Sequence, residues 1–182
     1  MGARFERTGA APGAGARRLR DLGERVRVAL ASALQTLGPE MVASIRAEMA
    51  RVQPGLHPFT VAQTGRARPL VGGALEAAVA FRVETTARGG YVWAGVPSGA
   101  GESGGVDLVT LAAIHEHGVT IAVTDAMRGY LHAQGLHLKA STLAVVIPPR
   151  PFIGPGLRRF TGAGGRAREV VKQNVARALR GR

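Results

Sequence analysis

The segment Ile147-Pro-Pro-Arg-Pro-Phe-Ile-Gly-Pro155 constrains the fold more than any other part of the chain. Each of its prolines fixes a backbone φ angle and removes a backbone N–H donor. A proline also disfavours helical geometry in the residue before it. We therefore expect a stiff, extended segment that ends at Gly154 and presents Arg150 and Phe152 at fixed places on the surface. Such a segment suits an assembly contact better than a catalytic loop.

The totals place the chain among ordinary globular proteins. Its 182 residues are enough for one domain with a substantial core. It contains no cysteine, which excludes disulfides, thiolate metal sites and cysteine nucleophiles. No uninterrupted apolar run reaches the ~20 residues of a membrane span, and the charged first residues are unlike a signal peptide. We expect a soluble protein made inside a cell, with no membrane partner.

The net charge of +12 comes almost entirely from arginine, since Lys139 and Lys172 are the only lysines. Arginine makes planar, bidentate contacts with carboxylate and phosphate groups. A balance of this kind raises the affinity for nucleic acid or for acidic protein surfaces. The heavy use of alanine, glycine, arginine and valine is equally typical of a GC-rich genome, which favours arginine whatever the function. Both explanations stay open.

The periodicity of apolar residues predicts the helices. Residues 1–15 show no period and are rich in glycine and alanine, which indicates a flexible N-terminal arm. Apolar residues at spacings of three and four then run from residue 16 to 52. Because Gly38-Pro39 lies inside this stretch, we expect either one kinked helix or two helices that meet there.

Alternation of apolar and polar residues predicts a β-hairpin. Its strands cover residues 79–84 and 91–96, and residues 85–90 connect them. The glycine-rich residues 97–105 indicate a mobile or assembly-dependent loop. The other expected elements are a helical turn at 73–78, helices at 106–116, 126–135 and 167–179, and β-prone runs at 119–123 and 143–147.

The triplet His115-Glu116-His117 invites comparison with a metal site. Two histidines on a helix need a spacing of four residues to reach one ion, whereas these are two apart. On a strand they would share a face, but no flanking ligand completes the set. We therefore expect no metal here and interpret Glu116 or a histidine as a group that binds a neighbouring loop or subunit.

No motif indicates catalysis. The chain has no nucleophile elbow, no Walker loop, and no glycine fingerprint between a strand and a helix. We predict a protein that is not an enzyme and needs no cofactor. A hydrolase using His115 and Glu116 is kept only as a check.

Three phrases, in order, resemble a known family. They are Ala112-Ala-Ile-His-Glu-His-Gly118, Val123-Thr-Asp-Ala-Met-Arg-Gly-Tyr-Leu131 and Ile147-Pro-Pro-Arg-Pro-Phe-Ile-Gly154. This order is similar to that of the tail-completion, or virion-morphogenesis, proteins of tailed bacteriophages and related prophage particles. In that family a phrase close to A-x-I-H-E-x-G precedes one close to I-P-x-R-P-F-[IL]. The resemblance covers roughly residues 20 to 180.

The resemblance implies an α+β fold in which a small, mainly antiparallel sheet is flanked by a long N-terminal helix and a C-terminal helix. Residues 16–182 would form a single domain of this type, with a glycine-rich loop at 97–105. Such proteins are tail terminators or neck proteins that join tail to head, and they act without catalysis.

The resemblance also implies partners and a location. The chain would form a ring with itself, most often a hexamer. It would contact a tail-tube or sheath protein and a head-side connector or portal-associated protein, while DNA passes through the lumen without being read. It would reside in the virion tail or neck after assembly in the bacterial host cytoplasm.

Of these phrases, we call residues 112–118 the first motif phrase and residues 147–154 the second motif phrase. Together they supply the candidate interface or structural residues. These are His115, Glu116, His117, Gly118, Arg150, Pro151 and Phe152. One interpretation places them at a contact between copies or in its support. The other packs both phrases inside the subunit, with Phe152 in the core and Arg150 paired with Glu116.

A second function stays open, namely a basic protein that binds duplex DNA through its arginine-rich C-terminal helix and N-terminal arm. The alternative for these charges is a solvated or subunit-facing surface. Aromatic residues make up only 4% of the chain, so the sequence offers no evident stacking platform for single strands.

Overall fold

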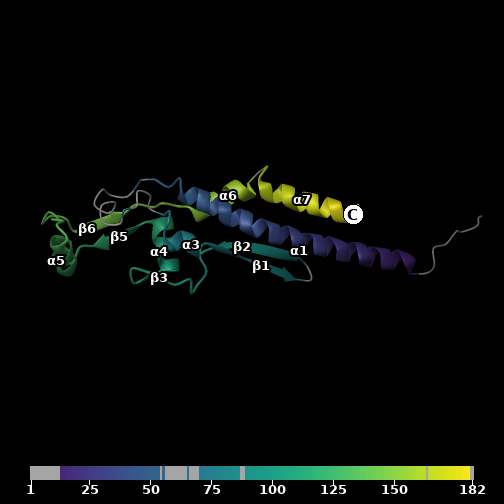
Figure 1. The fold of residues 1–182 in the computed structure, drawn as a ribbon, viewed down its shortest axis with the longest axis horizontal. Coiled ribbons are helices and arrows are strands. Elements are labelled where there is room, and N and C mark those ends of the chain that lie inside the picture. Colours follow the sequence, from purple (N-terminus) through teal and green to yellow (C-terminus); the bar gives the residue numbers. More distant parts are fainter. Residues whose placement is uncertain are drawn as a thin grey trace, which may run out of the picture.

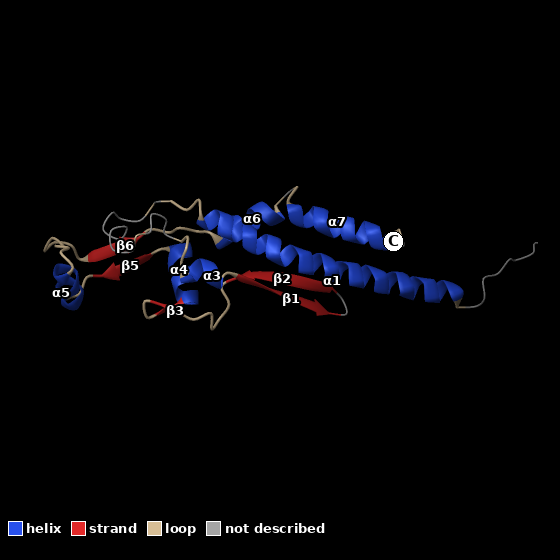
Figure 2. Ribbon diagram, viewed as in Figure 1, coloured by secondary structure: helices blue, strands red, loops and turns tan. Residues whose placement is uncertain are grey.

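The computed structural model describes residues 13–53, 55, 65, 70–86, 89–162 and 164–180. The helices are α1 (Ala14–Met49), α3 (Ala74–Ala78), α4 (Leu108–His117), α5 (Asp125–Ala133), α6 (Ile153–Thr161) and α7 (Arg166–Leu179). The strands are β1 (Ala80–Thr86), β2 (Gly89–Gly95), β3 (Glu102–Ser103), β4 (Val106–Asp107), β5 (Val119–Ala122) and β6 (Ala144–Ile147). The expected α+β class is confirmed: a long N-terminal helix, short antiparallel strands and a C-terminal helix (Figure 2).

Helix α1 is the axis of the molecule. Its 36 residues correspond to a length of ~54 Å at 1.5 Å per residue. Of the two arrangements expected around Gly38-Pro39, the structure has one continuous helix with Pro39 inside it. A side chain at residue 38 would overlap the ring of Phe81 from β1, so glycine lets the hairpin approach the helix closely. Most of the predicted N-terminal arm, residues 1–12, lies outside the described residues.

By length and composition alone, α1 is also long and apolar enough to cross a membrane. The sequence has no uninterrupted apolar run of that length, but one 18-residue stretch of α1 holds at most two charged residues and is apolar enough on average. A helix buried in the core of a globular protein meets the same criterion. The C-terminal half of α1 is such a helix, since it supplies the buried side chains Leu37, Ile45 and Met49.

Two layers cover α1 on different sides (Figure 1). Helices α6 and α7 pack against one side, and the β1–β2 hairpin packs against another. In the hairpin, Phe81 pairs with Ala94 on the face toward α1, as the contact with Gly38 requires. The adjacent pair, Arg82 and Trp93, lies on the outer face. The predicted alternation of buried and wetted residues in this hairpin is only partly present, since Phe81 on the inner face is 38% exposed.

The core is shared by helices, the hairpin and the segment after the prolines. Its most deeply buried large side chains are Phe152, Ile45, Met49 and Leu108. The other buried apolar residues are Ala33, Leu37, Met41, Val42, Leu70, Leu75, Val79, Ala94, Val96, Ala112, Phe160 and Val170. Leu108 and Ala112 anchor α4 in this core, which positions the end of α4, where the first motif phrase lies.

The described strands form three separate two-stranded antiparallel sheets rather than one continuous sheet. β1 pairs with β2, β3 with β4, and β5 with β6. The β3–β4 pair brings part of the glycine-rich loop at residues 97–105 into a short hairpin just before α4. The β5–β6 pair carries α5 and lies at the opposite end of the molecule from the start of α1 (Figure 1).

Candidate functional site

The first motif phrase, residues 112–118, covers the C-terminal part of α4 and the glycine that ends it. Asp107 begins this helix as its N-cap, because its carboxylate accepts a hydrogen bond from the amide of Thr110 at 2.9 Å. His115, Glu116 and His117 complete the helix, and Gly118 ends it with a left-handed φ of 73°. The amide of Gly118 donates to the carbonyl of Ile114 at 2.7 Å. The carboxylate of Glu116 is therefore carried on a helix whose two ends are both fixed.

Glu116 binds the backbone of the second motif phrase. Its Oε2 atom accepts from the amides of Phe152 at 2.9 Å and Ile153 at 3.2 Å, and its Oε1 atom accepts from Gly154 at 2.9 Å. These amides belong to the start of α6, where a helix leaves its first N–H groups without internal partners. A carboxylate there also interacts favourably with the helix dipole. Glu116 thus acts as an N-terminal cap supplied by another helix.

The proline segment has few backbone N–H donors, and each of those that remain makes a hydrogen bond. Pro148, Pro149 and Pro151 have no N–H, so between residues 148 and 152 only Arg150 and Phe152 can donate from the backbone. The amide of Arg150 donates to the carbonyl of His115 at 2.5 Å, and that of Phe152 donates to Glu116. Both donors therefore bind the last turn of α4.

The expectation that this segment presents Arg150 and Phe152 on the surface is wrong, since both side chains are buried, and the extended part stops before Gly154 because α6 begins at Ile153. Phe152 is 0% exposed and is among the largest fully buried side chains. Arg150 is also buried, and its guanidinium donates to the carbonyl of Gly55 at 3.4 Å. Of the two interpretations left open, the one that packs Phe152 in the core of the subunit is confirmed. The expectation that Glu116 binds a neighbouring loop is also confirmed, because its carboxylate accepts from the backbone amides of residues 152–154, although the sequence did not indicate these partners.

His115 and His117 lie in different surroundings although they are two residues apart. His117 is exposed, whereas His115 is half-buried, and its Nδ1 atom has no hydrogen-bond partner among the described residues. Burial lowers the pKa of His115, and the nearby positive charge of Arg150 lowers it further. Within the described ranges no group of three histidine, aspartate or glutamate side chains is placed to hold a metal ion.

Gly118 lets the two phrases approach each other. A Cβ atom at this position would lie 2.9 Å from the carbonyl oxygen of Ile147 and 2.9 Å from the nitrogen of Pro149. The structure therefore brings all the candidate residues into one junction between α4 and the start of α6. Within it, His117 and Pro151 are the exposed members, and the others are buried or half-buried.

The junction carries a separate structural unit, residues 119–147, which we call the distal lobe. It consists of β5, α5, β6 and the connecting segments, and it projects from one end of the molecule (Figure 1). No residue of the distal lobe is buried. Several of its apolar side chains are exposed, with Leu143 at 78%, Val146 at 67%, Tyr130 at 66% and Ile121 at 39%.

Polar contacts order the distal lobe in place of a core. Thr124 caps α5 by accepting from the amide of Met127 at 3.2 Å. The guanidinium of Arg128 donates to the carbonyls of Lys139 at 3.0 Å, Ala140 at 3.2 Å and Thr142 at 2.5 Å. The sequence predicted the elements of the lobe. It did not predict that Arg128 binds backbone carbonyls of the following loop, because no local pattern indicates this contact.

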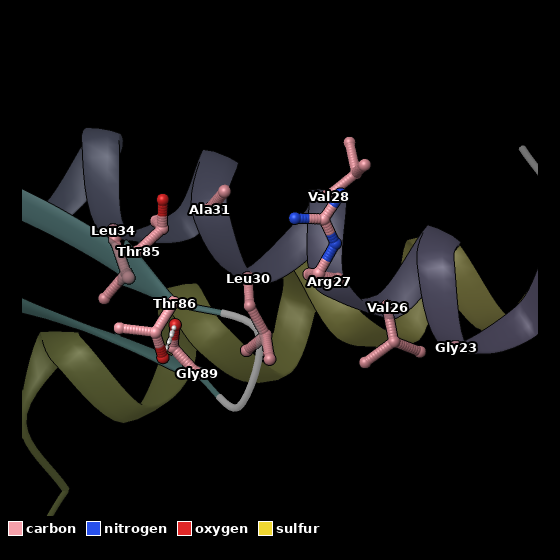
Figure 3. A pocket seen from close by; sticks show the side chains of 10 residues that line it. All are labelled: Gly23, Val26, Arg27, Val28, Leu30, Ala31, Leu34, Thr85, Thr86 and Gly89. Atoms are coloured by element: carbon pink, nitrogen blue, oxygen red, sulfur yellow. Dashed lines mark hydrogen bonds between the residues drawn. The ribbon is translucent and has the colours of Figure 1, made fainter.

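A groove lies at the other end of the molecule, between α1 and the tip of the β1–β2 hairpin (Figure 3). Its volume is about 320 Å³, and its walls include Val26, Leu30, Leu34 and Thr86. Among the described residues of its lining, Arg27 is the one with an ionisable side chain, and that guanidinium already pairs with Glu24 at 2.6 Å. The described lining therefore offers no general base to activate the hydroxyls of Thr85 and Thr86, and no general acid–base pair.

Comparisons with protein-family models, with curated proteins and with solved structures each find no match to this chain.

Proposed function

We propose that the chain is a structural protein of a phage-like particle, which forms a ring at the tail end or in the neck and joins tail to head. The observation that carries this proposal is the distal lobe, which exposes apolar side chains and buries none. A lone two-stranded sheet is only marginally stable in water. Exposed apolar side chains gathered on one unit are typical of a surface that a partner covers.

The mounting of the distal lobe supports the same proposal. β5 starts at Val119, directly after Gly118, and β6 ends at Ile147, directly before the proline segment. Both ends of the lobe are thus held by the junction in which Glu116 binds the start of α6. A rigid mount fixes the direction of the lobe relative to the core. A ring requires that fixed direction, because one patch of each copy must meet a different patch of the next.

The two motif phrases, in their order, add the resemblance to tail-completion proteins. On that basis the ring would most often contain six copies and would contact a tail-tube or sheath protein and a head-side connector or portal-associated protein. In this proposal the chain works in the virion without catalysis or a cofactor, and DNA passes through the lumen.

Sedimentation and electron microscopy of the purified chain test the proposal. We expect wild-type protein to form ring-shaped oligomers with rising concentration or upon addition of tail-tube protein. Val146→Asp places a charge on the exposed face of β6 and is expected to abolish the rings. Val106→Asp is the matched control. Val106 is also an exposed valine, at 36%, but it lies on the short strand β4, outside the lobe. Rings that form equally well with Val146→Asp, or a wild-type chain that never forms them, would contradict the proposal.

A further inference from the structure

We infer that the surface where α7 lies against α1 binds the phosphate backbone of duplex DNA. The residues that carry this inference are Arg25 of α1 and Lys172, Arg177 and Arg180 of α7, which we call the basic face. All four side chains are exposed. The inference goes beyond ring formation and does not depend on it, because it concerns a different surface from the distal lobe.

The tertiary structure brings these charges together. Arg25 and Arg177 line one groove between α1 and α7, although they are far apart in the sequence. Lys172, Arg177 and Arg180 line an adjoining hollow along α7. The helix dipole favours cations at the end of α7, but it gives no reason for Arg25 to face them from α1. Glu24 lines the same groove but pairs with Arg27, so the positive charges of Arg25 and Arg177 still repel each other, and an anion bound between them would remove that cost.

Several carboxylates of α1 and α7 have partners of their own. Glu24 pairs with Arg27, Glu40 with Arg166, and Glu48 with both Arg51 and Arg159. Glu169 lines the same hollow as Lys172 and keeps its negative charge, although it accepts a hydrogen bond from Gln173 at 2.8 Å. In the described part of the chain, none of the four basic-face cations forms an ion pair with a carboxylate. Among the described residues that line this hollow, three cations outnumber the one carboxylate of Glu169, and the excess positive charge is available to an external partner.

The density of charge favours duplex DNA as that partner. Lys172 and Arg180 are eight residues apart, which corresponds to ~12 Å along a helix. Duplex DNA carries about 7 negative charges over that distance, since one falls every ~1.7 Å of its axis. The sequence has no aromatic residue in 13–34 or 166–180, so these parts of the two helices offer no base-stacking platform for a single strand. Contacts to phosphates alone would bind duplexes of any sequence.

Fluorescence anisotropy with a labelled, mixed-sequence duplex tests the inference on the full chain. We expect the logarithm of the affinity to fall linearly with the logarithm of salt concentration. Lys172→Gln with Arg180→Gln should reduce the affinity about tenfold or more at ~0.1 M salt and lower the slope by about 2, as expected for two lost phosphate contacts. Arg82→Gln with Lys139→Gln is the matched control, because it removes the same charges from exposed positions on other surfaces. It should change the affinity by less than about twofold, since non-contacting charges are screened.

Three results would overturn the inference. The first is an equal loss of affinity in both double variants, which would show that net charge alone attracts DNA. The second is a single strand that binds as tightly as the duplex. The third is poly-glutamate that displaces the duplex at equal charge, which would indicate an acidic protein as the partner. Val146→Asp should retain duplex binding, so the failure of the ring proposal and the failure of this inference give different results.

Discussion

The carboxylate of Glu116 accepts a hydrogen bond from the backbone amide of Phe152, with 2.9 Å between Oε2 and the nitrogen. Phe152 is the N-cap residue of α6 and has no side-chain oxygen with which to cap the helix. Glu116 satisfies this amide and the next two from the end of α4. One side chain thereby ties the first motif phrase to the second and directs Phe152 into the core.

Replacing Glu116 should destabilise the chain substantially. In Glu116→Ala the amides of residues 152–154 lose their acceptor in a half-buried place, which we expect to cost about 2–4 kcal/mol because charge-assisted hydrogen bonds are among the stronger ones. Glu116→Gln keeps one acceptor oxygen and should cost about half as much. Urea denaturation monitored by circular dichroism measures both. His117→Ala, an exposed neighbour on the same turn, should stay within about 0.5 kcal/mol. A Glu116→Ala protein as stable as that control would show that water replaces the carboxylate at no cost.

Phe152→Ala should be the most damaging single truncation at the junction. Phe152 is 0% exposed, so the change removes a fully buried ring and leaves a cavity. The expected loss in the free energy of unfolding is about 3–5 kcal/mol. Leu143→Ala in the distal lobe is the comparison, since a side chain that is 78% exposed should cost less than about 0.5 kcal/mol in the isolated subunit. Losses of similar size in the two variants would mean that Phe152 contributes little to the core.

The elements that sequence periodicity defines were predicted well. Apolar residues recur at spacings of three and four from Leu19 to Met49, and α1 covers that stretch. The alternation in residues 79–84 and 91–96 corresponds to β1 and β2, whose strands extend two residues further toward the turn. The carboxylate of Asp107, expected near the start of a helix, is its N-cap. In each case the information is local, because the pattern repeats over one element.

What the sequence did not reveal depends on contacts between distant residues. Glu116 and Phe152 are 36 positions apart, and no local rule tells whether a carboxylate will bind a side chain or a backbone amide. The exposure of Leu143 and Val146 could not be predicted either, because it also depends on tertiary contacts. An apolar run such as residues 143–147 predicts a strand, but its burial depends on what packs over it. The grouping of Arg25 with Arg177 likewise arises only when α7 folds back onto α1.

The stability of the chain should depend on pH through His115. Burial, and then the charge of Arg150, lowers the pKa of this histidine below its ordinary value of about 6.5. The unfolded chain therefore binds the proton more readily than the folded one. Stability from this source is complete above about pH 6.5 and is lost as the pH falls from there through the lowered folded pKa.

Urea denaturation at pH 7.5, 6.5 and 5.5 checks this dependence. We expect His115→Asn to flatten the fall in stability below about pH 6.5, where an ordinary histidine becomes protonated. His117→Asn is the matched control, because His117 is exposed on the same turn and should leave the fall unchanged. A wild-type profile that is no steeper than that of His115→Asn would remove His115 from the explanation.

Comparing Gly118→Ala with Gly135→Ala should separate two destabilising effects of a side chain at the junction, namely backbone strain and steric overlap. The left-handed φ of 73° disfavours alanine, and a Cβ atom would lie 2.9 Å from both the carbonyl oxygen of Ile147 and the nitrogen of Pro149. Gly135→Ala isolates the first effect, since Gly135 has a φ of 79° but a Cβ atom there would meet no neighbour within 4 Å. We expect about 1 kcal/mol for Gly135→Ala and about 2–4 kcal/mol for Gly118→Ala, because only the latter must also push the proline segment away from α4. Equal losses in the free energy of unfolding would mean that the proline segment shifts freely, and the rigid mount of the distal lobe would then have no support from this contact.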